Sequence, residues 1–316
     1  AVGKDALIAS TTANNNTAVG YDCLQANTTG ASNASVGKSA LEANTTGSAN
    51  AAFGADALGS NTTASNNTAV GTNSLNANTT GSENVAVGRN ALDANTTAAN
   101  NTAVGYASMG ANTTGAGNTA LGTDALTTNT TANENVAIGR SALKLNTTGA
   151  SNCAVGYFAL DANTTASNNT AVGTKALAGN TTGASNTAVG ADALAANATA
   201  ANNTAVGKDA LLANTTGTAG TAVGKGALQS NVNGTDNTGL GCLALSATTS
   251  GSNNVAVGRS SLQNNTTGHS NVAVGYNAAL SVTTGTENVA VGMAALDNSD
   301  VGSFNTAIGK SALGND

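Results

Sequence analysis

The sequence predicts an all-β fold, a parallel β-solenoid of about eighteen 17-residue turns. Glycine recurs at a constant spacing, from Gly3 and Gly20 to Gly309, without an insertion or deletion, which is typical of stacked, identical turns. An apolar residue always precedes this glycine, and leucine nearly always follows it four positions later. A helical repeat is excluded because Asn, Thr and Gly, which are poor helix formers, fill most of each turn.

We number the positions of a turn from its glycine, so that position −1 precedes the glycine and position +4 lies four places after it. The segment N-T-A-V-G alternates with the period of a short β-strand that ends at glycine. We expect the position −1 valine and the position +4 leucine to form the core. Because side chains alternate along a strand, position −3 should then point inward and the position −2 alanine outward. The position −4 asparagines are expected to stack as a hydrogen-bonded ladder. Residues 1–316 are expected to form one repetitive rod, a segment of a longer fibre protein.

The composition argues against several classes of function. Only 8% of the residues are charged and the net charge is −6 without a basic run, so nucleic acid is not an expected partner. No apolar stretch is long enough for membrane insertion of this segment. The single histidine, His269, lies in a variable turn and no acid pair or metal-spaced cluster recurs. We therefore expect no enzymatic activity, no catalytic residue, no metal and no cofactor.

Position −2 is alanine in seventeen of nineteen turns, although the strand alternation points it outward. A position that stays small along a whole face is expected where another β-surface packs closely. The alternative is that tight corners or the copying of repeats select alanine there. The predicted self-association face comprises Ala18, Ala52, Ala69, Ala86, Ala103, Ala120, Ala137, Ala171, Ala188 and Ala205.

Position +1 varies and collects the tyrosines and most of the basic residues. This variable exposed edge is either a solubilising edge or a ridge that contacts a ligand, since Tyr and Arg are enriched in interfaces. It includes Lys4, Tyr21, Lys38, Arg89, Tyr106, Arg140, Tyr157 and Lys208.

The N-T-T segment at positions +7 to +9 allows two further interpretations. Regular Thr and Asn ranks on a solenoid could bind ice or a polysaccharide. The same segment also forms the N-x-[ST] acceptor sequence for N-glycosylation. The candidate glycosylation sites are Asn27, Asn44, Asn61, Asn78, Asn95, Asn112, Asn129, Asn146, Asn163, Asn180, Asn197, Asn214 and Asn265.

The segments N-T-A-V-G (residues 16–20, 67–71 and 186–190) and N-V-A-V-G or N-V-A-I-G (84–88 and 135–139) resemble a known repeat. They are similar to the S-V-A-I-G repeat of trimeric autotransporter adhesin heads, which also appears in phage tail-fibre proteins. The resemblance implies a left-handed parallel β-roll that trimerises and binds host or other surfaces, outside the cell or on its surface. The repeat of that family is usually shorter than the repeat of this chain, so no ligand residue can be transferred.

Together these observations predict a non-enzymatic, extracellular structural or adhesive fibre that associates with itself, as a trimer or a filament. Its other possible partners are glycans and host or environmental surfaces. One alternative is a solenoid that binds ice or a polysaccharide through its Thr/Asn face. Another is the shaft of a phage tail fibre.

Overall fold

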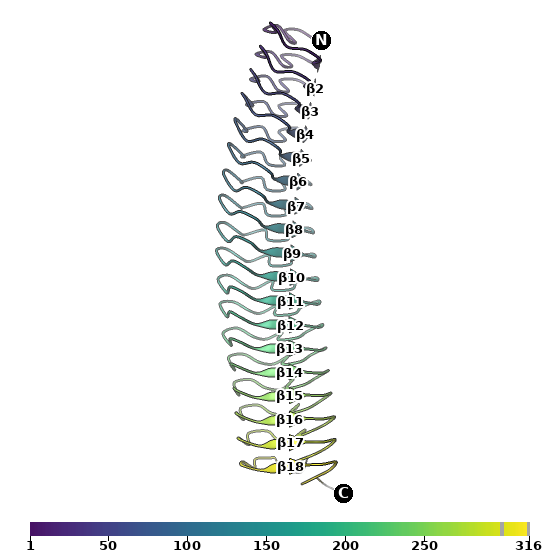
Figure 1. The fold of residues 1–316 in the computed structure, drawn as a ribbon, viewed down its shortest axis with the longest axis vertical. Helices are drawn as coiled ribbons and strands as arrows, with labels where there is room; N and C mark the ends of the chain where they lie inside the picture. Colours follow the sequence, from purple (N-terminus) through teal and green to yellow (C-terminus); the bar gives the residue numbers. More distant parts are fainter. Residues whose placement is uncertain (298–299, 315–316) are drawn as a thin grey trace. The chain divides into compact units, whose positions relative to one another are not determined.

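The computed structural model describes residues 1–297 and 300–314 and confirms the predicted fold class. Among these residues the regular secondary structure is β-strand, and there is no helix. The chain divides into two compact units, residues 1–152 and 153–316. Each unit is a parallel β-solenoid with one short strand per turn (Figure 1). The prediction that residues 1–316 form a single rod stays a prediction, and so does the left hand of the coil.

Every strand has three residues and occupies positions −3 to −1 of its turn. The strands of the first unit are β1 (Thr17–Val19), β2 (Ala34–Val36), β3 (Ala51–Phe53), β4 (Thr68–Val70), β5 (Val85–Val87), β6 (Thr102–Val104), β7 (Thr119–Leu121) and β8 (Val136–Ile138). Those of the second unit are β9 (Cys153–Val155), β10 (Thr170–Val172), β11 (Thr187–Val189), β12 (Thr204–Val206), β13 (Thr221–Val223), β14 (Thr238–Leu240), β15 (Val255–Val257), β16 (Val272–Val274), β17 (Val289–Val291) and β18 (Thr306–Ile308).

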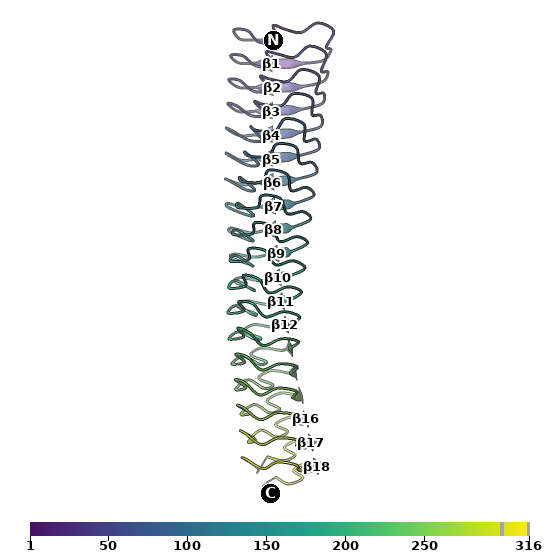
Figure 2. The same cartoon turned by 90° about the vertical axis from the view of Figure 1, so that its left-hand side faces the viewer.

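Within each unit, strands of successive turns pair in parallel and without a register shift. Thr68 of β4 lies opposite Val85 of β5, and the other residue pairs in the ladders are likewise one repeat apart. The Thr68 N–H donates to the Asn84 carbonyl at 2.8 Å, and the Gly71 N–H donates to the Phe53 carbonyl at 2.8 Å. The strands consequently follow one another along the stack in both views (Figures 1 and 2).

The glycine that ends each strand is required by its conformation and by its contact with the next turn. At Gly71, φ is +127°, which side chains rarely adopt. A β-carbon there would lie 2.7 Å from the Gly88 carbonyl carbon, in a gap too small for it. The regular recurrence of glycine is therefore the condition for close stacking.

Three other positions of each turn, +2, +4 and +12, adopt the left-handed conformation without being glycine in most turns. In one turn these are Asp22 (φ 54°), Leu24 (φ 52°) and Ser32 (φ 60°). β-branched residues are strongly disfavoured there. Among the described residues, those with a left-handed backbone at these three positions are never Val, Ile or Thr, although Val and Thr are abundant elsewhere in the chain. This explains why the buried position +4 is Leu, Met109 or Ala279 and never Val.

The apolar part of the interior consists mainly of the position +4 leucines and two columns of alanine, at −2 and +3. Leu24, Leu41 and Leu58 have no exposed surface, which confirms the leucine half of the predicted core. The valine half is wrong: the position −1 side chains lie outside, where Val19 and Val70 are each 38% exposed. The predicted strand alternation is correct but its faces are exchanged.

The reason for the exchange is the thinness of the interior. A β-carbon placed on Gly239, one of the two position −2 residues that is not alanine, would lie 3.4 Å from Cγ of Leu228. The distance between the strand and the leucine column therefore accommodates a methyl group at position −2. A valine or phenylalanine in this space would overpack the core.

We predict that Gly71→Ala lowers the free energy of unfolding by about 2 kcal/mol or more, because it places a β-carbon against the next turn at an unfavourable φ. Chemical denaturation followed by circular dichroism measures the effect. The control is Thr72→Ala, an exposed position +1 residue whose counterpart one turn earlier is Ala55. It should change stability by less than about 0.5 kcal/mol. Equal stability of the two variants would contradict the stacking argument.

Candidate functional site

The structure buries the alanines that were predicted to form a self-association face. Ala18 is 1% exposed and the other nine have no exposed surface. Their side chains fill the thin interior of their own chain, so they cannot contact a partner and the prediction is wrong. The residues concerned are Ala18, Ala52, Ala69, Ala86, Ala103, Ala120, Ala137, Ala171, Ala188 and Ala205.

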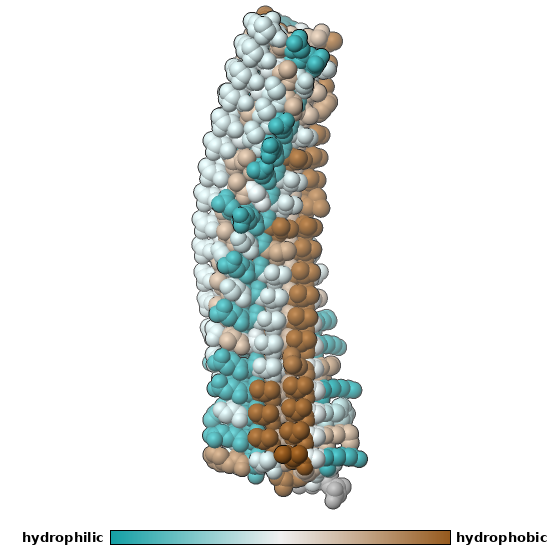
Figure 3. All heavy atoms as spheres, viewed as in Figure 1, coloured by the Kyte–Doolittle hydropathy of each residue, from teal (hydrophilic) through white to brown (hydrophobic). Residues whose placement is uncertain are grey.

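The outward side of the strands carries the position −3 and −1 side chains, and we call these two columns the strand face. Position −1 is apolar in every turn and exposed or half-buried. Its most exposed members within the strands include Phe53 at 42% and Leu121 at 45%. Figure 3 shows this column as an apolar stripe along the strands of the second unit. A second apolar column accompanies it at β15 to β17, where position −3 is also valine.

Position −3 completes the strand face with Thr or Val and three exceptions, Ala34, Ala51 and Cys153. The side chains at this position are half-buried in most turns. Parallel sheets in proteins are normally covered on both faces. Here the alanine side of each sheet is covered by the solenoid interior. The strand face is continuously apolar at position −1, and no described segment of its own unit covers it.

The asparagines at position +7, which were the candidate glycosylation sites, are buried side chains of a hydrogen-bonded ladder. Asn44 Nδ2 donates to Asn27 Oδ1 at 2.8 Å and to the Gly47 carbonyl at 3.0 Å, and Asn61 repeats the pattern one turn later. Because a glycan is attached through Nδ2, this prediction is wrong for the folded chain. The buried candidates are Asn27, Asn44, Asn61, Asn78, Asn95, Asn112, Asn129, Asn146, Asn163, Asn180, Asn197, Asn214 and Asn265.

The asparagines at position −4 form a second ladder, as the sequence predicted. Asn33 Oδ1 accepts from the backbone N–H of Asn50 at 2.9 Å and from its Nδ2 at 3.2 Å. Asn50 Nδ2 also donates to the Ala64 carbonyl at 2.9 Å. Each amide thus satisfies main-chain groups at a corner of the turn, which makes this column structural.

The paired threonines at positions +8 and +9 do not form a flat rank. Thr28 Oγ1 donates to the Thr45 carbonyl at 3.0 Å, and Thr45 Oγ1 donates to the Thr62 carbonyl at 3.0 Å. The position +8 hydroxyls therefore bind the next turn, while the neighbouring Asn column is interior. Most position +8 threonines are half-buried, whereas the position +9 threonines, such as Thr29 and Thr46, are exposed. The proposed Thr/Asn face is thus reduced to a single exposed column.

The variable edge at position +1 is exposed at all eight predicted residues, Lys4, Tyr21, Lys38, Arg89, Tyr106, Arg140, Tyr157 and Lys208. Lys4 forms an ion pair with Asp5 at 3.5 Å, and its Nζ lies 5.3 Å from the centre of the Tyr21 ring. The electrostatic influence of Tyr21, followed by that of Asp5, raises the pKa of Lys4. Such exposed pairs contribute little stability.

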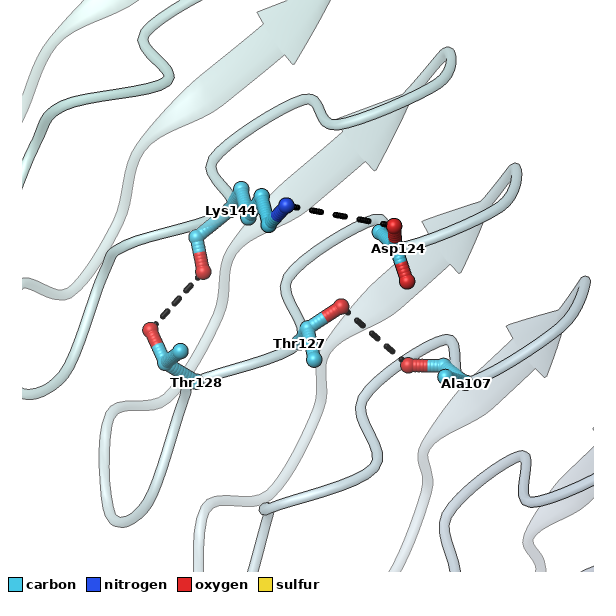
Figure 4. A network of polar contacts seen from close by, with 5 residues as sticks. All are labelled: Ala107, Asp124, Thr127, Thr128 and Lys144. Atoms are coloured by element: carbon cyan, nitrogen blue, oxygen red, sulfur yellow. Dashed lines mark hydrogen bonds and ion pairs between the residues drawn. The ribbon is translucent and has the colours of Figure 1, made fainter.

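In the first unit, polar side chains that follow the glycine also form contacts between neighbouring turns. Lys144 lies 3.9 Å from Asp124, and the backbone carbonyl of Lys144 accepts a bond from Thr128 Oγ1 at 2.8 Å (Figure 4). Thr127 Oγ1 donates to the Ala107 carbonyl of a preceding turn at 3.2 Å. These contacts join neighbouring turns.

The described residues contain no group of three or more His, Cys, Asp or Glu side chains placed to hold a metal ion. No helix in the described part of the chain could cross a membrane. The three cysteines have different surroundings: Cys23 is buried, Cys153 is half-buried on the strand face and Cys242 is exposed on the variable edge. Burial raises the pKa of the Cys23 thiol, which donates to Ser35 Oγ at 2.9 Å.

The chain matches no family model, and it matches no curated protein.

Within the described residues of the second unit, the position +7 ladder has two defects that the sequence analysis missed. Thr248 and Val282 replace Asn, so Asn231 Oδ1 and Asn265 Oδ1 receive no amide hydrogen, and Thr248 Oγ1 is also unpaired. The sequence could have revealed these defects, because the N-T-T pattern is interrupted at the same two positions. Each buried, unpaired polar atom costs about 1–3 kcal/mol.

We predict that Thr248→Asn increases the free energy of unfolding by about 1–3 kcal/mol. The new amide would donate to Asn231 Oδ1 and accept from Asn265 Nδ2, as asparagines do at this position in other turns. The midpoint of thermal or urea unfolding measures the gain. Ser250→Asn, at an exposed position that is Asn233 one turn earlier, is the control and should leave the midpoint unchanged. A lower midpoint for Thr248→Asn would contradict the ladder argument.

Proposed function

We propose that this protein is a non-catalytic, extracellular structural or adhesive fibre whose copies associate through the strand face. The observation that carries the proposal is the unbroken apolar column at position −1, which is exposed or half-buried in every turn of the described chain. Contiguous apolar surface of this extent marks an interaction site in soluble proteins. Covering it would supply the second layer that parallel sheets normally have.

A second copy of the chain is the occupant that the repeat favours. The strand face repeats with every turn, and an identical chain offers the same period and the same apolar columns. Most homo-oligomers have closed cyclic symmetry. An axis parallel to the stack would bring equal turns of the copies to the same height. The resemblance to adhesin heads supports three copies around such an axis, and a tail-fibre shaft would use the same arrangement.

Cys153 provides a native probe of this arrangement, because it lies at position −3 on the strand face. We predict that mild oxidation of the assembled protein with copper–phenanthroline joins Cys153 of one copy to Cys153 of another, giving a covalent dimer on a non-reducing gel. Cys153→Ser should abolish the dimer. Cys242→Ser, the control on the exposed variable edge, should preserve it, and Cys23 is shielded by burial.

Cross-linking that depends on Cys242 would show association through the variable edge instead. An assembly without any Cys153 cross-link would contradict parallel packing of the strand faces. A single-chain mass at all concentrations in analytical ultracentrifugation would contradict self-association itself.

We further predict that the triple substitution of Val70, Val87 and Val104 by Glu reduces the assembly to single chains, because it places three carboxylates within the apolar interface. These side chains lie outside the interior, so the fold should persist by circular dichroism. The matched control introduces Glu at Thr80, Thr97 and Thr114, the exposed position +9 residues of the same turns. An unchanged mass for the valine variant, or equal dissociation of both variants, would contradict the assignment of the strand face.

A second candidate function is binding to a regular surface such as ice or a polysaccharide. The observation that favours it is the alignment of Thr and Val in columns on short, paired strands, with about 4.8 Å between turns. It differs from the interpretation based on the N-T-T segment, since the columns concerned are −3 and −1. An ice-recrystallisation assay with the single-chain protein discriminates between the two functions. Strong inhibition by the native chain that is lost in the triple valine variant would favour surface binding.

A further inference from the structure

The structure separates two sets of N-x-[ST] acceptor sequences that look alike in the sequence. The first, at position +7, is buried and its Nδ2 atoms are bonded in the ladder. The second is N-N-T, which begins at position +12 and ends on the first residue of the strand. It occurs at Asn15, Asn66, Asn100, Asn168 and Asn202.

The position +12 asparagines have the accessibility that the buried set lacks. Asn15, Asn66, Asn100, Asn168 and Asn202 are all exposed, and their φ angles of 59°, 62°, 62°, 63° and 62° place them at a left-handed corner. Asn66 uses its backbone N–H to bind the Ser48 carbonyl at 3.1 Å. The side-chain amides of Asn66, Asn100 and Asn202 form no hydrogen bond with another residue of the described chain.

The spacing of these corners suits bulky attachments. Within each unit two acceptors are separated by two repeats, Asn66 from Asn100 and Asn168 from Asn202. Two turns of a parallel stack correspond to about 10 Å. The intervening turns carry Glu83 and Ser185 at this position, so adjacent turns never compete for the same space. The corner is separated from the strand face by the buried position −4 asparagine, so that glycans would border this face.

We propose that the five position +12 asparagines, Asn15, Asn66, Asn100, Asn168 and Asn202, are N-glycan acceptor sites of the folded chain. A lipid diphosphate-linked oligosaccharide is the required donor. The Nδ2 atom forms a bond to the anomeric carbon, the bond between this carbon and the diphosphate oxygen breaks, the lipid diphosphate leaves, and the amide proton passes to a base. With few charges on the surface, the attached sugars would supply hydration. The inference rests on the proposed export of the chain and is independent of the strand face.

The test is secretion of the full chain from a eukaryotic host, followed by enzymatic release of N-glycans in ¹⁸O-water and peptide mapping. We expect ¹⁸O-labelled aspartate at positions 15, 66, 100, 168 and 202. The position +7 asparagines of the same turns, Asn61, Asn95, Asn163 and Asn197, should remain unlabelled and serve as internal controls. The isolated exposed motifs at Asn233 and Asn264 are followed in the same map.

A matched variant removes the acceptor sequence while it preserves the fold. Replacing Thr68, Thr102, Thr170 and Thr204 by Val destroys four of the five N-N-T motifs, and Val is the natural residue at this position in Val85 and Val136. The variant should lose the mass of up to four glycans and retain its circular dichroism spectrum. Secreted native chains without label at the five position +12 sites, or with equal label at the position +7 sites, would overturn the proposal. Chains retained inside the cell are mapped in the same way.

Discussion

Hydrogen bonding between turns that lie one period apart is the interaction on which the whole structure depends. Each strand pairs with its copy in the neighbouring repeat, and the glycine at its end lets the two backbones approach to a distance that excludes a β-carbon. Once this register is fixed, every side chain stacks on the same position of the neighbouring turn. The properties of the protein are therefore properties of columns, and a residue that suits one turn must also suit its copies.

The thin interior explains why the chain is rich in Asn, Ala and Gly and poor in large apolar residues. Leucine and two alanine columns fill the space between the strand and the opposite segment, while two asparagine columns satisfy the backbone at the corners. Buried polar groups are tolerated when they are fully bonded, and a continuous ladder meets this condition turn after turn. Interruption of the ladder at Thr248 leaves a local deficit of hydrogen bonds inside an otherwise regular unit.

The same division between inside and outside decides which surfaces are available for function. The alanine column and the N-T-T asparagines are needed by the fold, and the position +8 hydroxyls bind the following turn. The accessible surfaces include the strand face with its apolar position −1 column, the charged and aromatic edge, the position +9 threonines and the corner at position +12. The proposed fibre would use the first of these surfaces and leave the others to solvent, sugars or further partners.

The sequence by itself determined the period, the parallel solenoid, the short strand before each glycine, the buried leucine and the position −4 ladder. It determined these because they follow from spacing and from the intrinsic conformations of Gly, Asn and Leu. It also held two signals that were missed: position −1 varies among Val, Phe, Leu and Ile, as an exposed site tolerates, and position +4 excludes β-branched residues, as a left-handed residue requires. Only the tertiary structure decided which side of the strand is inside. Alternation with a period of two has two possible phases, and the choice depended on the distance between the strand and the leucine column, which admits alanine and excludes valine.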